Sequence, residues 1–183
     1  MLKILYELCS SKRAACIYAN YNDTSKFHFG TIIAINDEEI AIQTILPDGE
    51  MDGIVVIGVD CINRVETNSQ YVEKMKKLCP DTSVCLRNLQ IDNRQIMKSI
   101  LLFALKKSQV VSIELINSGY NDVVGVIRSI KDKECMVEQF DEYGCADGES
   151  HFYLKDITKI AILTQEEKII MRLQENTGDG SVC

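Results

Sequence analysis

The sequence lacks a long apolar run and contains only two prolines and two histidines among its 183 residues. Its longest apolar stretches, such as 54–59 and 100–105, are much shorter than the roughly 20 residues of a membrane-spanning helix. No apolar signal segment follows Met1. With 46% hydrophobic and 26% charged residues, the composition is that of an ordinary globular protein. We therefore expect a cytoplasmic protein with no membrane partner.

The motifs that mark common enzyme and cofactor sites are also missing. The sequence contains no phosphate-binding loop, no dinucleotide fingerprint and no Gly-x-Ser-x-Gly elbow. Its eight cysteines include no Cys-x-x-Cys pair, so we expect reduced thiols and no structural zinc site. The acidic segment 48–53 is similar to the start of a calcium loop, but Val59 stands where that loop needs a glutamate. We expect no enzyme activity, no cofactor and no metal.

The two histidines are the only imidazole candidates for a general base. His28 lies between Phe27 and Phe29, and alternation along a strand places its side chain on the face opposite the phenyl rings. His151 also lies in an aromatic run, before Phe152. We expect both histidines to be exposed or at a rim rather than catalytic.

The charge is acidic and spread evenly along the chain. The net charge is −7, to which residues 1–90 contribute −3 from nine basic and twelve acidic residues. Affinity for nucleic acid depends largely on Lys and Arg neutralising phosphates. This charge balance therefore argues against a nucleic-acid partner.

An internal repeat dominates what the sequence does contain. Shifted by 95 positions, residues 30–78 align with 125–173 without a gap and share eleven identities. We interpret several of these shared residues as structural turn residues, and expect Gly53 and Gly148 to adopt a φ that disfavours a Cβ. The turn residues predicted in this way are Gly30, Gly49, Asp52, Gly53, Gly125, Gly144, Asp147 and Gly148.

Each copy of the repeat contains five short apolar or β-branched runs that are typical of strands. The expected strands are 14–19, 27–35, 40–46, 54–57 and 62–66, then 110–116, 123–130, 135–140, 150–154 and 157–163. Helices are expected near Leu2 to Cys9 and at 69–78, 92–107 and 165–174, with caps at Ser69, Asp92 and Thr164. The chain then divides into a first helix-plus-strand unit at 1–78, a linker at 79–91, a second unit at 92–175 and a flexible tail at 176–183.

A helix followed by five short strands resembles the Sm-like version of the SH3-type barrel. Gly30 to Asp37, and their copy Gly125 to Asp132, are similar to the first Sm motif, in which a glycine opens a bent strand before an acidic turn. The pattern also resembles small bacterial proteins of unknown function. The resemblance implies a mainly β chain with flanking helices, built as two tandem Sm/SH3-like five-stranded barrels related by internal duplication.

The Sm resemblance brings an alternative function, association with nucleic acid. Sm-like proteins contact RNA bases through an Asn after the acidic turn and a basic residue in the second motif. Here Ala41 and Met136 stand at the Asn position, and 60–63 and 155–158 stand where the basic pair belongs. We therefore assign no nucleic-acid-binding residue, and nucleic-acid association stays the alternative.

The leading hypothesis is a non-enzymatic interaction or assembly module with a protein partner or self-association. Tyrosines near the expected strand ends form its candidate interaction surface, namely Tyr18, Tyr21, Tyr120 and Tyr143. In Sm-like proteins the fourth strand of one barrel pairs with the fifth strand of the next. We expect the two halves of this chain to meet by such edge pairing or through the apolar face of the helix at 92–107.

Overall fold

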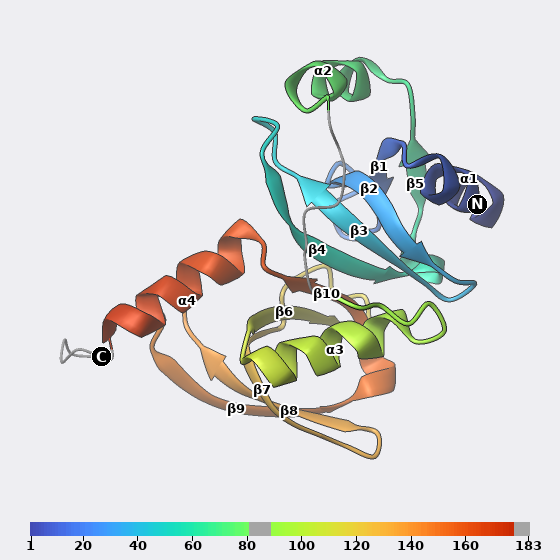
Figure 1. Cartoon of the computed structure of the whole chain (residues 1–183). Coiled ribbons are helices and arrows are strands. Elements are labelled where there is room, and N and C mark those ends of the chain that lie inside the picture. The colour runs from blue at the N-terminus through green and yellow to red at the C-terminus, as the bar shows by residue number, and fades with distance from the viewer. Residues whose placement is uncertain (81–88, 178–183) are drawn as a thin grey trace.

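The computed structural model describes residues 1–80 and 89–177. In these residues ten strands form one antiparallel sheet, with four α-helices packed around it (Figure 1). The order of the strands across the sheet is β5-β1-β2-β3-β4-β10-β6-β7-β8-β9. The chain is therefore mainly β with flanking helices, as predicted.

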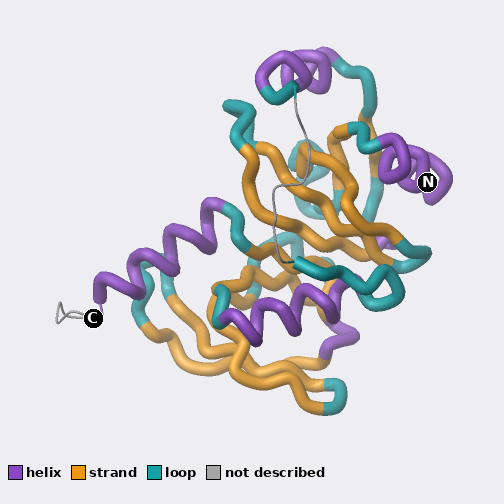
Figure 2. Tube along the Cα trace, viewed as in Figure 1, coloured by secondary structure: helices purple, strands orange, loops and turns teal. Residues whose placement is uncertain are grey.

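The two halves present their elements in the same order along the chain. Figure 2 shows the helices lying outside the strands. The first half contains α1 (Leu2–Ser11), β1 (Ala14–Tyr18), β2 (His28–Ile35), β3 (Glu39–Ile45), β4 (Met51–Gly58), a 3-10 turn (Val59–Cys61), β5 (Arg64–Glu66) and α2 (Gln70–Leu78). The second half contains α3 (Ile96–Lys107), β6 (Val110–Leu115), β7 (Val123–Lys131), β8 (Glu134–Phe140), β9 (Ala146–Tyr153), a 3-10 turn (Leu154–Asp156), β10 (Ile157–Ile162) and α4 (Gln165–Thr177).

The structure does not show the two separate five-stranded barrels that the sequence predicts. The strands instead form one sheet that is not closed, because β4 of the first half pairs with β10 of the second. Val56 lies opposite Ile160 and Ile54 opposite Ile162, and all four side chains are fully buried. Joining these two edges removes four aliphatic side chains from water and satisfies the backbone groups of both strands. The predicted edge pairing between the halves is confirmed.

Strand irregularities recur 95 residues apart. The register of β2 against β3 shifts between Ile32 and Ala34, and that of β7 against β8 shifts between Ile127 and Ser129. The 3-10 turns at 59–61 and 154–156 are separated by the same interval. β-bulges bend a strand at a defined position, so the two halves share local backbone geometry as well as strand order.

Gly30 and Gly125 lie within strands rather than at turns, which corrects their expected role. A Cβ on Gly30 would lie 2.0 Å from the carbonyl oxygen of Gln43, and a Cβ on Gly125 would lie 1.9 Å from that of Glu138. Each glycine therefore permits the close approach of a neighbouring strand at the same place in its half.

Gly49 and Gly144 occupy tight turns, as predicted. Their φ angles are +94° and +81°, in the left-handed region that favours glycine. The N–H of Gly49 donates to the carbonyl of Leu46, and the N–H of Gly144 donates to that of Asp141.

The Asp–Gly pairs at 52–53 and 147–148 lie inside β4 and β9, so their prediction as turn residues is wrong. Gly148 has the expected positive φ of +83°, and a Cβ there would meet nothing within 4 Å. Gly53 does not have a positive φ, but a Cβ there would lie 2.1 Å from the carbonyl oxygen of Ile162. Crowding at the junction of the halves, rather than φ, requires glycine at position 53.

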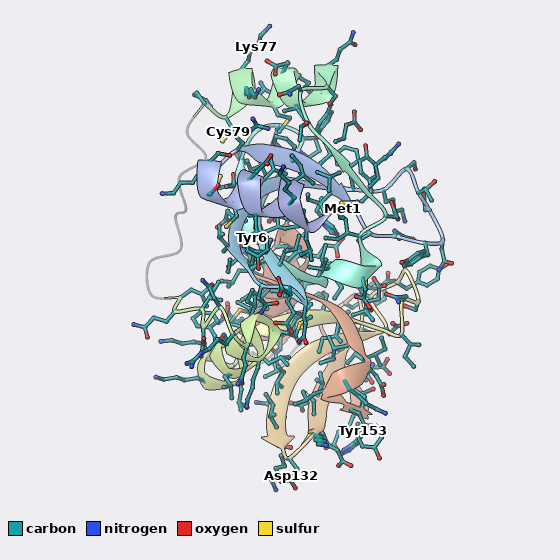
Figure 3. All side chains as sticks on the ribbon, turned by 90° about the vertical axis from the view of Figure 1, so that its right-hand side faces the viewer. Met1, Tyr6, Lys77, Cys79, Asp132 and Tyr153 are labelled. Atoms are coloured by element: carbon teal, nitrogen blue, oxygen red, sulfur yellow. The ribbon has the colours of Figure 1, made fainter. Side chains whose placement is uncertain are left out.

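The helices pack on separate core clusters. Leu5 and Leu8 of α1 join a cluster with Ile40 of β3, whereas Val72 of α2 packs with Phe29 on another. Helix α3 contacts both halves, because its buried residues share one cluster with strands on each side of the β4–β10 pair. In the side view of Figure 3, Lys77 marks one end of the molecule and Asp132 and Tyr153 the other.

Helix starts follow the predicted caps in two of three cases. The Ser69 hydroxyl accepts the N–H of Val72 at the start of α2, and Thr164 precedes α4 as predicted. Helix α3 begins at Ile96 without a side-chain cap, since the Asp92 carboxylate accepts the N–H of Arg94 instead.

Parts of the expected linker and tail, 81–88 and 178–183, lie outside the described residues. Helix α4 extends to Thr177, three residues beyond its predicted end. Across 1–80 and 89–177, no helix is long and apolar enough to cross a membrane.

Candidate functional site

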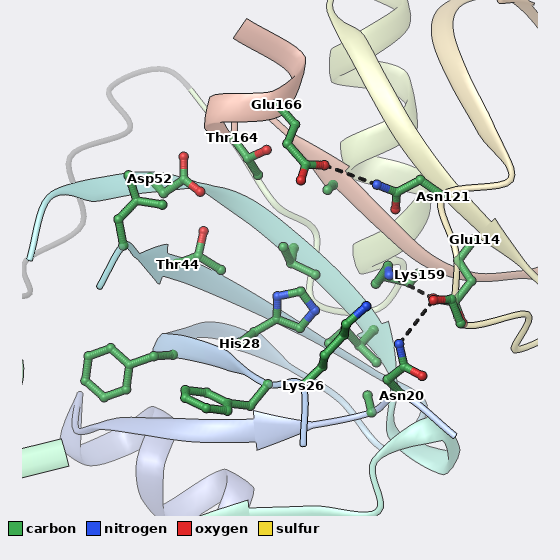
Figure 4. Close-up of a pocket in the computed structure, with 18 of the residues that line it drawn as sticks. Asn20, Lys26, His28, Thr44, Asp52, Glu114, Asn121, Lys159, Thr164 and Glu166 are labelled. Atoms are coloured by element: carbon green, nitrogen blue, oxygen red, sulfur yellow. Dashed lines mark hydrogen bonds and ion pairs between the residues drawn. The ribbon is translucent and has the colours of Figure 1, made fainter. Parts of the chain in front are cut away.

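A cleft of about 710 Å³ lies where the two halves meet (Figure 4). The first half contributes the β1–β2 loop, β2 and β4, and the second contributes the β6–β7 loop, β10 and the start of α4. Its volume falls within the range of about 300–1,000 Å³ that is usual for small-molecule sites.

The floor of the cleft is one face of the strand pair that joins the halves. Val55 lies opposite Ala161, and Ile57 lies opposite Lys159. Side chains of directly opposed residues point to the same face of a sheet, and all four line the cleft. The alternate residues, including Val56 and Ile160, point the other way and pack in the cluster under α3.

A buried ion pair lies in the wall of the cleft. Lys159 Nζ lies 2.8 Å from Glu114 Oε2, and their side chains are only 16% and 5% exposed. A buried carboxylate needs such a partner, because an isolated buried charge is costly. The two residues lie side by side because β10 pairs with β6 as well as with β4.

His28 points into the middle of the cleft and is half-buried (Figure 4). Burial, together with the positive charge of Lys159, lowers the pKa of its imidazole to about 4. The ring is therefore neutral at pH 7. Among the described residues, no group forms a hydrogen bond with it, so both ring nitrogens are available to a bound molecule. Phe27 and Phe29 pack with Tyr18 and Tyr71 in another cluster.

Lys26 extends from the β1–β2 loop toward His28 at the mouth of the cleft (Figure 4). Its side chain is exposed and forms no ion pair with any described residue. The cleft thus has one cation, which interacts electrostatically with Asp23 but forms no close ion pair, beside one neutral imidazole.

The opposite end of the cleft is acidic, and its carboxylates have partners. Asp52 accepts the N–H of Gln165 at 2.7 Å, and Lys168 Nζ lies 4.0 Å away. Burial raises the pKa of Asp52 above its usual value. Glu166 accepts the side-chain amide of Asn121 at 3.2 Å, which links α4 to the β6–β7 loop.

The start of α4, at the rim of the cleft, is capped by the chain itself. Glu167 accepts both the N–H and the hydroxyl of Thr164, at 2.8 and 2.6 Å, and its other oxygen accepts the hydroxyl of Ser112. The bond from the Thr164 N–H to Glu167 is one of the two bonds of a capping box. Asp52 accepts the N–H of Gln165 in the first turn, so a carboxylate of the protein already lies at this helix start.

Tyr18, predicted as part of an interaction surface, is only 5% exposed. Its hydroxyl donates to Glu66 at 2.7 Å, and the Arg64 guanidinium lies 3.6 Å from its ring centroid. The alternation of β1 turns this ring into the core, so Tyr18 does not contribute to the surface.

The three other predicted tyrosines are exposed, at 53% for Tyr21 and 67% for both Tyr120 and Tyr143. The loops of Tyr21 and Tyr120 meet beside the cleft, where the side-chain amide of Asn20 donates to the carbonyl of Gly119 at 3.1 Å. Tyr143 lies in the β8–β9 turn, outside the cleft lining. The structure therefore brings together two of the four candidates.

The thiols of Cys16 and Cys61 are poorly suited to nucleophilic chemistry. Burial and the neighbouring Asp60 raise the pKa of Cys61 to about 12, and burial raises that of Cys16 to about 12. A cysteine protonated at pH 7 is a weak nucleophile. Cys145 is disulfide-bonded, so the reduced state expected for the thiols does not hold there.

Sequence reasoning identified His28 as a rim residue but did not select Lys26, Glu114 or Lys159. One signal for Lys159 is present in the sequence, since it is the one charged residue inside the aliphatic run of β10. Its partner could not be found without the pairing of β10 with β6.

In the described ranges no group of three or more His, Cys, Asp or Glu side chains could hold a metal ion. No known protein family, curated protein or solved structure matches the chain.

Proposed function

We propose that this protein is a non-enzymatic interaction module, made of two duplicated Sm-like units, that binds its ligand in the cleft between them. The duplication accounts for strand order, register shifts and 3-10 turns that recur 95 residues apart. In this proposal each unit is a five-stranded Sm/SH3-like barrel opened where β4 and β10 join.

The observation that carries the proposal is the composition of the cleft. An aliphatic floor lies beneath two polar side chains, Lys26 and His28, that have no ion-pair or hydrogen-bond partner among the described residues. Small-molecule sites combine such an apolar surface with a few convergent polar groups. The other charged groups of the cleft are already compensated within the protein.

The chemistry of the cleft favours binding over reaction. A histidine acting as general base is usually oriented by a partner group, and no described carboxylate hydrogen-bonds to His28. Cys61, the thiol in the lining, is protonated at pH 7 because its pKa is raised to about 12.

A tryptophan reporter tests the proposal, because the chain contains no tryptophan. Asn121→Trp places the indole at the cleft, and Tyr143→Trp places it in an exposed turn as a matched control. We expect members of a small-molecule fragment set to change the fluorescence of the cleft reporter saturably, and not that of the control.

A second substitution, Ala161→Leu, adds side-chain volume to the floor of the cleft. We expect it to weaken the binding of the same fragments at least about tenfold, or 1.4 kcal/mol. A fragment set that leaves the cleft reporter unchanged would contradict the proposal. Tight, salt-resistant binding of single-stranded RNA to the wild-type protein would favour the nucleic-acid alternative instead.

A further inference from the structure

We propose that the ligand of the cleft is a small organic carboxylate with an apolar body, its carboxylate bound between Lys26 and His28 and its body lying along the cleft. This inference rests on the proposed function of the cleft. It assigns the chemical class of the ligand and its orientation.

The charges that line the cleft favour an anion over a cation. Glu114 is already neutralised by Lys159, and Asp52 accepts a backbone N–H with Lys168 nearby. Lys26 is the lining cation that has no ion pair among the described residues. A cationic ligand would have to compete for carboxylates that are already engaged, whereas a carboxylate would gain a partner without breaking a contact.

The neutral imidazole of His28 adds a directed hydrogen bond. One of its ring nitrogens carries a hydrogen at pH 7 and can donate to a carboxylate oxygen. Figure 4 shows Lys26 and His28 converging from the loop and from β2, with Lys159 on the facing wall. A carboxylate placed there would accept from two donors.

The floor beside this polar end is apolar. Val55 and Ile57 lie on β4, and Ala161 lies opposite Val55 on β10. These three side chains are only 2%, 0% and 8% exposed, so they offer a ligand little apolar area. Tyr120 in the same lining is 67% exposed, and an apolar group that covers it would remove area from water at about 25 cal/mol per Å². The carboxylate supplies direction, and apolar contact with the exposed part of the lining adds affinity.

An anion beside His28 must raise the pKa of its imidazole, because opposite charge favours the protonated form. By reciprocity, protonation of His28 must strengthen carboxylate binding, so affinity should rise as the pH falls. The other charged groups that line the cleft are Lys26, Asp52, Glu114, Lys159 and Glu166. With a free pKa of about 4 and a rise of about 2 units on binding, the gain between about pH 7.5 and 5.5 is on the order of fourfold.

The test follows the two imidazole signals of the protein by ¹H NMR while 3-phenylpropionate is added to the full chain. The matched probe is 3-phenylpropionamide, which has the same ring and chain but no charge. His151 is an internal control, because its side chain is 66% exposed and outside the cleft. The expected dissociation constant for probes of this size is about 1 mM.

We expect the acid to shift the His28 signal saturably and to raise its pKa by at least about one unit, with His151 unchanged. Lys26→Gln should weaken binding of the acid about fivefold and leave binding of the amide unchanged. Lys131→Gln, an exposed lysine in the second half, is the matched control and should change neither. His28→Gln should abolish the pH dependence of acid binding.

Two outcomes would overturn the inference in different ways. If the amide binds as tightly as the acid, and Lys26→Gln affects neither, the cleft binds ligands but the carboxylate assignment is wrong. If neither probe moves the His28 signal and the fragment set leaves the Asn121→Trp reporter unchanged, the proposed function fails as well.

Discussion

The fourth strand of each half has a different neighbour, although both occupy the same position in the repeat. β4 pairs with β10 in the middle of the sheet, whereas β9 is an end strand of the described sheet. Val56 of β4 is fully buried, and its counterpart 95 residues on, His151 of β9, has a side chain that is 66% exposed. The same strand position has thus become a joint in one half and an edge in the other.

Side-chain chemistry explains which edges are joined. The joined edges carry Ile54, Val56, Ile160 and Ile162, while the outer edge β9 carries Asp147, Glu149 and His151. The other outer edge, β5, is only three residues long and contains two charged residues. Short strands and charged side chains discourage pairing with another chain. The outer edges are therefore less suited to strand pairing with another chain than the joined edges are.

The largest expected effect comes from placing a charge in the joint. Val56→Asp puts a carboxylate among fully buried aliphatic side chains, and we expect it to lower the free energy of unfolding by about 4 kcal/mol. His151→Asp makes the same change at the equivalent position of β9 and should cost less than about 0.5 kcal/mol. Urea denaturation followed by circular dichroism measures both. Equal losses would show that β9 is not an exposed edge.

The two glycines of the Asp–Gly pairs should differ less in the stability that is lost when each is replaced by alanine. Gly53→Ala would bring a methyl group within 2.1 Å of the Ile162 carbonyl oxygen and 2.3 Å of the Thr164 nitrogen. Both groups are backbone at the joint, so we expect a loss of about 3 kcal/mol. Gly148→Ala meets open space and should cost about 1 kcal/mol, because only its positive φ opposes a Cβ. Thermal unfolding compares the two, and a larger loss at Gly148 would reverse the interpretation.

The smallest contrast concerns two basic residues at equivalent positions, Lys159 in β10 and Arg64 in β5. Lys159→Met removes the partner of Glu114, whose side chain is 5% exposed, and should cost about 2 kcal/mol. Arg64→Met loses a stacking contact with Tyr18 near the surface and should cost about 0.5 kcal/mol. Chemical denaturation at neutral pH checks the difference. Glu114→Gln in the Lys159→Met background should recover part of the loss if the buried charge is its cause.

Much of the secondary structure could be predicted from local sequence. The repeat located equivalent strands in both halves, and Ser69 and Thr164 located the starts of α2 and α4. Gly49 and Gly144 were predicted correctly because a tight turn with positive φ leaves a local signature. Gly53 was predicted to need a special φ, but the structure shows that neighbouring atoms leave no room for a Cβ. Those atoms belong to residues more than 100 positions away in the sequence.

The candidate site could be predicted only in part. Alternation placed His28 opposite its flanking phenylalanines, but the residues that change its protonation and surround it come from β10, β6 and α4. Tyr18 was predicted as a surface residue because aromatic residues near strand ends are common both in cores and at interfaces. Its burial beneath Arg64 depends on the β1–β5 pairing.

The sequence by itself determined a mainly β chain with flanking helices, because periodicity, turn residues and helix caps act over a few neighbouring positions. Only the tertiary structure decided that the strands form one sheet and that a cleft opens beside the β4–β10 joint, which is one of the two ways of meeting that the sequence left open. These features depend on which distant edges bury their aliphatic side chains together. Which edges pair depends on the difference in free energy between alternative arrangements of all the strands. A local sequence pattern does not contain that information.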